Sequence, residues 1–193
     1  FSTIDEEFEK YEEDIDTIAS DDLDELDNDL DNILEDFEEI NFEAGFNEIT
    51  WTTDTQFQNF TQKVNEYVTD VKAEIGKIED KLGDAEDHLG DEDDYDEVED
   101  DIDDALDIIS NGYIDSIDDL RDYLGDLANE LEDRNYEDES KDVEDVEDDV
   151  KSFESEIDSI ESKLEDMQDD IVDLEDNHND KDDILQEMEA ICN

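Results

Sequence analysis

Residues 143–174 read VEDVEDDVKSFESEIDSIESKLEDMQDDIVDL, and this stretch decides the fold of the chain. Its apolar residues recur at alternating spacings of three and four. Such spacing places them all on one face of an α-helix and, sustained over four heptads, predicts a long helix in a coiled coil or bundle. The same register continues to Cys192, with a polar interruption around His178. The apolar residues of the quoted stretch are Val143, Val146, Val150, Phe153, Ile157, Ile160, Leu164, Met167, Ile171 and Leu174.

Earlier parts of the chain repeat this spacing. From Ile4 to Ile40 it is broken by one slip in phase, between Ile15 and Leu23, which Ala19 bridges. A slip of this kind locally unwinds a coiled coil. The spacing returns over residues 54–89 and is ended by Gly90, as glycine commonly ends a helix. In the next segment the phase continues across Ser110-Asn111-Gly112, so we expect a continuous helix with a weak point there.

The pattern therefore predicts an all-α fold: an elongated antiparallel four-helix bundle or coiled-coil hairpins. A single helical domain covers residues 1–193, and its expected helices lie at about 3–42, 54–89, 92–134 and 138–192. The seams of the two middle segments pass through Tyr67 and Leu106. Eight residues represent the expected core: Leu26, Leu30, Val71, Ile75, Leu120, Leu124, Ile157 and Leu164.

Net charge excludes several classes of protein. The 193 residues carry 75 Asp and Glu against 11 Lys and Arg, a formal net charge of −64. Direct nucleic-acid binding is not expected, because phosphate contacts need Lys and Arg, and the same argument excludes adsorption to anionic lipid. No apolar run approaches the ~18 residues that span a membrane, so no membrane insertion is expected. A lone Cys192 excludes a disulfide framework.

Sequence patterns for catalysis are not found. Carboxylates at this density are typical of solvated helix faces, whereas acid–base catalysis needs a carboxyl group in a pocket with a shifted pKa. His88 and His178 do not share a zinc-type spacing, and neither a nucleophile elbow nor a phosphate-binding glycine loop occurs. We therefore expect a protein that is not an enzyme and has no catalytic residues.

Calcium binding is expected in a diffuse form. Asp91–Asp96 begins like an EF-hand loop but has Asp96 where the glycine should stand. Calcium accepts six to eight oxygens in loose geometry, so acidic clusters on neighbouring helices or chains can share it at low affinity. The candidate ligands are Asp91, Asp93, Asp94, Asp96, Asp100, Asp104, Asp142, Asp145 and Asp149.

Repulsion within the chain gives cations a role in folding. Acidic pairs four residues apart recur, and each costs ~0.2–0.5 kcal/mol at low salt. About twenty such pairs would cost roughly 4–10 kcal/mol, which is the stability of a whole domain. We expect the fold to be marginal unless salt or bound cations relieve this repulsion.

Aromatic residues set the connection at residues 43–53 apart from the rest of the chain. Phe46 and Trp51 lie in it among few charges. They either cap one end of the bundle or form an apolar patch that meets another chain. We take them as candidate interaction residues, with self or related acidic helical chains as partners.

A proline-free, heptad-patterned and strongly acidic chain that begins at Phe1 resembles the granule-lattice and trichocyst-matrix proteins of ciliates. The resemblance implies a structural protein, cut from a precursor, secreted or stored in a secretory granule, and rearranged by calcium. One alternative is a surface or virion protein of a hypersaline organism, extracellular in high salt. Another is a nucleic-acid mimic, a rod that offers carboxylates in place of phosphates.

Overall fold

The computed structural model describes residues 10–40, 53–89, 95–110 and 114–192, with side chains left undescribed at 53–59, 95, 114, 115 and 173–192. No strand occurs in these residues, which confirms the predicted all-α class. After a helical stretch at residues 10–16, the elements are the π-helix η1 (Thr17–Asp22) and the α-helices α2 (Leu23–Glu39), α3 (Thr53–Leu89), α4 (Tyr95–Ile108), α5 (Ile114–Asp133) and α6 (Glu137–Cys192).

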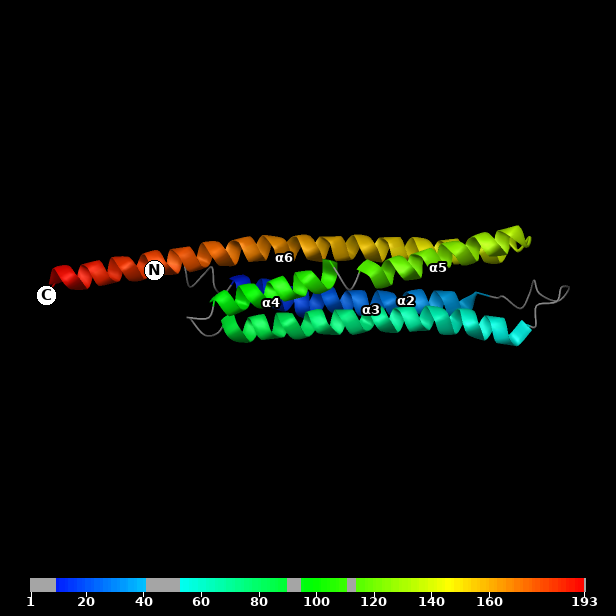
Figure 1. Cartoon of the computed structure of the whole chain (residues 1–193), viewed down its shortest axis with the longest axis horizontal. Helices are drawn as coiled ribbons and strands as arrows, with labels where there is room; N and C mark the ends of the chain where they lie inside the picture. The colour runs from blue at the N-terminus through cyan, green and yellow to red at the C-terminus, as the bar shows by residue number, and fades with distance from the viewer. Residues whose placement is uncertain (1–9, 41–52, 90–94, 111–113, 193) are drawn as a thin grey trace.

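The helices lie side by side along one long axis, and α6 is the longest of them (Figure 1). Its Gln168 donates to Asp103 of α4 at 3.1 Å, and its Glu154 accepts from Arg121 of α5. Helices α4 and α5 therefore follow one another along α6 and run antiparallel to it, as expected for the segment that precedes a short connection.

The segment predicted as one helix over 92–134 is described as two, and this corrects the sequence-based expectation. Helix α4 ends at Ile108 and α5 begins at Ile114, with residues 111–113 outside the description. Between them the sequence reads Ser110-Asn111-Gly112, three residues of low helix propensity, of which glycine is the least favourable by about 1 kcal/mol relative to alanine.

The predicted phase slip coincides with η1. The backbone N–H of Leu23 donates to the carbonyl of Ile18, five residues earlier, which is the π-helical bond. This wider turn lets Ile18 and Leu23, at 2 % and 0 % exposure, both reach the core despite their spacing of five. Ala19 packs against the core as the bridging residue.

The core follows the heptad seams. All eight residues predicted as core are buried, with exposures of 4 % or less. At two seam positions the buried residue is the neighbour of the predicted one: Ala105 is buried while Leu106 is half-buried, and Val68 is buried while Tyr67 is half-buried. The predicted seam residues Ile40 and Phe60 are also half-buried. Adjacent apolar residues fit a spacing of three or of four equally well, so the pattern could not choose between them.

A C-terminal cap ends α5 and turns the chain into α6. Asn135 takes a left-handed conformation with φ 68°, and its N–H donates to Glu132. The N–H of Tyr136 donates to Leu131, which completes the two bonds of a Schellman motif. Across the hairpin, the buried Ser140 hydroxyl donates to the Ala128 carbonyl at 2.8 Å.

Candidate cation-binding groove

An acidic groove runs between α2 and α6. One part, about 340 Å³ in volume, is lined by residues that include Asp36 and Asp149, and an adjoining part of about 220 Å³ shares these two residues and extends to Glu39 and Asp142. A third part, about 290 Å³, lies farther along the same two helices and includes Lys163. Among the described residues, no Lys or Arg lines the first two parts.

One heptad position on each helix faces this groove. Each residue at this position directly precedes a buried seam residue, and such flanking positions face one another across a pair of packed helices. Opposed residues form three rungs, which we call the α2–α6 ladder: Asp22–Lys163, Asp29–Glu156 and Asp36–Asp149.

Opposite charges meet only in the first rung of the ladder, where Lys163 Nζ lies 2.5 Å from the carboxylate of Asp22. In the second rung, Glu156 lies opposite Asp29, and a hydrogen bond between the two carboxyl groups would favour the form that holds a proton. Partial burial is the main cause that raises the pKa of Glu156, and the charges of Asp29 and Glu25 raise it further. This rung is therefore most stable when it holds a proton.

The third rung places Asp149 opposite Asp36. Partial burial is again the main cause that raises the pKa of Asp149, and the charge of Asp36 is the next. Asp145, Asp148 and Asp29 add to the effect in that order. Asp36 and Asp149 are both exposed to solvent, so water screens part of their mutual repulsion.

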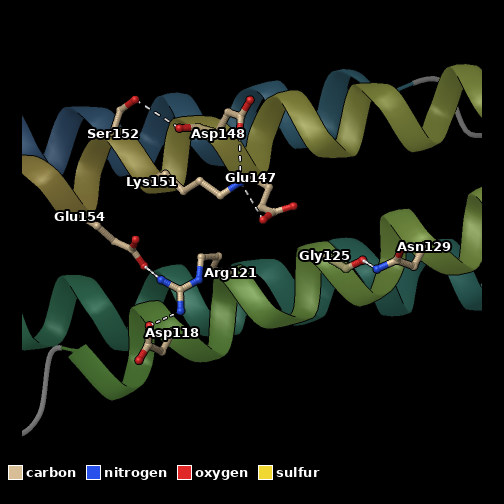
Figure 2. A network of polar contacts seen from close by, with 9 residues as sticks. All are labelled: Asp118, Arg121, Gly125, Asn129, Glu147, Asp148, Lys151, Ser152 and Glu154. Carbon is tan, nitrogen blue, oxygen red and sulfur yellow. Dashed lines mark hydrogen bonds and ion pairs between the residues drawn. The ribbon is translucent and has the colours of Figure 1, made fainter.

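Elsewhere, a basic side chain joins the acids of neighbouring helices. Lys72 of α3 lies 2.9 Å from both Asp27 and Asp31 of α2. Arg121 of α5 reaches across to Glu154 of α6 at 2.5 Å, and Figure 2 shows this bridge between the two helices. In the described part of the chain, no Lys or Arg pairs with the acids of the other two rungs of the ladder.

The predicted metal ligands on α6 lie at the groove. Asp142, Asp145 and Asp149 line one part of it together, on successive turns of the helix. Their counterparts on α2, Asp36 and Glu39, were not predicted. The heptad position of Asp36 was visible in the sequence, but the helix that it faces was not.

The predicted ligands on α4 are placed differently. Asp96 and Asp100 are exposed, while Asp104 pairs with Lys81 of α3 at 2.6 Å. Within the described part of the chain, no three His, Cys, Asp or Glu side chains are positioned to hold a metal ion together. The remaining candidates lie outside the described residues: Asp91, Asp93 and Asp94.

The candidate interaction residues Phe46 and Trp51 also lie outside the described residues. Their assignment to chain-to-chain contact stays a prediction.

No protein-family model, curated protein or solved structure matches this chain. In the described residues, no helix combines the length and the apolar character that crossing a bilayer requires. The class of protein that the fold defines is an acidic, elongated, all-helical protein.

Proposed function

We propose that this chain is a non-enzymatic structural protein that assembles with itself or with related acidic helical chains, and that its folding and packing depend on cations, chiefly calcium. The α2–α6 ladder is the observation that carries the proposal. Two of its three rungs oppose carboxylates from different helices, and both contain a group whose pKa is raised. A cation held between them would join helices that otherwise repel.

Calcium suits this role better than a monovalent ion. The Debye length is ~8 Å at physiological salt, so screening leaves carboxylates on touching helices repelling each other. Calcium accepts six to eight oxygens in flexible geometry and can therefore bridge acids that were not arranged as a compact site. Magnesium should be less effective, because it demands octahedral geometry and gives up its water reluctantly.

The same neutralisation would allow separate copies to pack. A chain of net charge −64 repels its own copies along its whole length, and cations shared between surfaces would remove that barrier. This property fits a protein secreted or stored at high density in a secretory granule, as the resemblance to ciliate granule-matrix proteins implies.

Circular dichroism during cation titration tests the proposal. In low salt with EDTA the helical signal should be incomplete, and about millimolar calcium should raise it because the ladder closes. A chelator should reverse the change, and magnesium should act more weakly. Full helicity in EDTA and low salt, with no calorimetric uptake of calcium, would contradict the proposal. Folding only in molar NaCl would support the hypersaline alternative.

Self-assembly can be followed through Trp51, the only tryptophan in the chain. If the 43–53 segment meets another copy, the emission of Trp51 should shift to shorter wavelength as protein concentration rises in calcium, because the indole leaves water. Sedimentation measured over the same range should show larger species. Emission that stays constant while larger species form would place the contact elsewhere on the molecule.

A further inference from the structure

The hairpin of α3 and α4 contains a buried acid, whereas the other acids of the described residues are exposed or only partly buried. Asp101 is 8 % exposed, and no other acid of the described residues is buried to this degree. Its two carboxylate oxygens contact two side chains of α3: Lys81 Nζ at 3.1 Å from Oδ1 and His88 Nδ1 at 2.9 Å from Oδ2. A buried carboxylate with these partners ties the two helices together.

The second ring nitrogen of His88 also faces a carboxylate. His88 Nε2 lies 3.3 Å from Glu97 Oε2, on the first turn of α4. An ionised carboxylate only accepts hydrogen bonds, and a neutral imidazole carries a single N–H. Both contacts can therefore be hydrogen bonds only when the ring is an imidazolium, which donates from both nitrogens.

We propose that His88 is a proton-operated clasp, which fastens the end of α3 to the start of α4 when it is protonated and loosens as it loses the proton. After deprotonation, one nitrogen can still donate to Asp101, but the other presents a lone pair to Glu97. The contact with Glu97 then changes from attraction to repulsion.

Charges around the imidazole ring favour its protonated form, in which the clasp is fastened. From α4, Glu97 and Asp101 face the imidazole, and on α3 itself Asp84 lies one turn earlier. Lys81 is the nearby positive group, and its hydrogen bonds to Asp104 and Asp101 raise its pKa, so it stays charged throughout the range in which histidine titrates. His88 also occupies the last turn of α3, where the helix dipole favours a positive charge.

Stability from the clasp should depend on pH with a definite sign. A free imidazole titrates near pH ~6.5. The clasp contributes fully while the folded ring holds its proton, and its contribution is lost as the ring gives up that proton at higher pH. The acid rungs of the α2–α6 ladder also favour low pH, so the pH dependence of the wild-type protein alone does not separate the two. The His88→Gln variant separates them, because it leaves the ladder intact.

The experiment compares melting temperatures of the wild type and His88→Gln at about pH 5.5 and pH 8, on either side of the histidine range. Both proteins are held in high NaCl with EDTA, so that the ladder is screened and no calcium contributes. The wild type should melt about 2–4 °C above the variant at the lower pH, and most of this gap should disappear at the higher pH. His178→Gln is the matched control and should follow the wild type at both pH values.

A second variant protects the test against a simple loss of packing at residue 88. Glu97→Gln keeps the shape of the partner of His88 and removes its charge. It should therefore reduce the pH-dependent difference in melting temperature that His88→Gln produces, while Asp101 and Lys81 stay paired. If His88→Gln and the wild type differ by the same amount at both pH values, the contact is structural and the clasp is wrong. That outcome would leave the calcium proposal standing, because no step of this test involves calcium.

Discussion

Ile157→Asp should greatly lower the stability of the folded protein. Ile157 is 4 % exposed and lies in the middle of the α6 seam. The substitution removes a buried aliphatic side chain and leaves an unpaired carboxylate, which together should cost about 4 kcal/mol or more. Because natural domains have about 5–15 kcal/mol of stability, thermal and denaturant unfolding should both show a large loss.

Two further variants separate the causes of this loss. Ile157→Ala also creates a cavity but introduces no charge. It should therefore cost about 2–4 kcal/mol, and the variant should remain folded in calcium. Ser162→Asp adds the same charge at an exposed position of the same helix and should cost about 1 kcal/mol or less, because it forms two new acidic pairs, with Asp158 and Asp166. If Ile157→Asp melted together with Ser162→Asp, the register of α6 would be wrong.

The core could be predicted because it depends on one helix at a time. A spacing of three and four defines the face that a helix buries, whatever its partner is. Residues as distant as Leu26 and Leu164 were therefore predicted as core without knowledge of how their helices pair. The phase slip at Ala19 was visible for the same reason, although the sequence could not show that a π-helical turn would absorb it.

The groove could not be predicted, because it depends on which helices meet and in which register. Asp149 and Asp36 are far apart in sequence and become a rung only when α2 and α6 pack antiparallel. Asp101 was missed for a related reason. An acid beside a seam residue is buried only where the neighbouring helix presents basic side chains that pair with it. Lys81 and His88, two heptad-spaced basic residues beside the α3 seam, were the signal that could have indicated it.

Reversing the charge of one side of the ladder should remove much of the need for cations. In Asp149→Lys/Glu156→Lys, each acid–acid rung becomes an ion pair like the natural rung of Lys163. Loss of repulsion and gain of attraction should stabilise the fold by about 1–2 kcal/mol in low salt with EDTA. For a chain of this size, that raises the melting temperature by roughly 2–8 °C. The calcium needed to complete the helical signal should fall accordingly.

A matched control is available on the outer face of α6. Asp158 and Glu165 are exposed, seven residues apart like the ladder residues, and each directly follows a buried seam residue. Asp158→Lys/Glu165→Lys therefore makes the same change in net charge away from the groove. If stability depends only on net charge, the two double variants will behave alike, and the ladder would then have no special role. A larger gain for the ladder variant would locate the repulsion between α2 and α6.

The pH dependence gives a second measure of the same rungs. Asp149 and Glu156 have raised pKa values in the fold, so the folded protein binds their protons more tightly than the unfolded chain does. Their contribution to stability must therefore grow as pH falls from neutral toward their ordinary values near ~4, and must be lost as pH rises through the raised values. The ladder variant lacks both carboxyl groups, so its melting temperature in low salt should change less between pH 7 and pH 5 than that of the wild type or of the outer-face control. Equal pH dependence in all three proteins would show that these rungs do not bind the protons, and the same carboxylates would then be poor candidates for holding calcium.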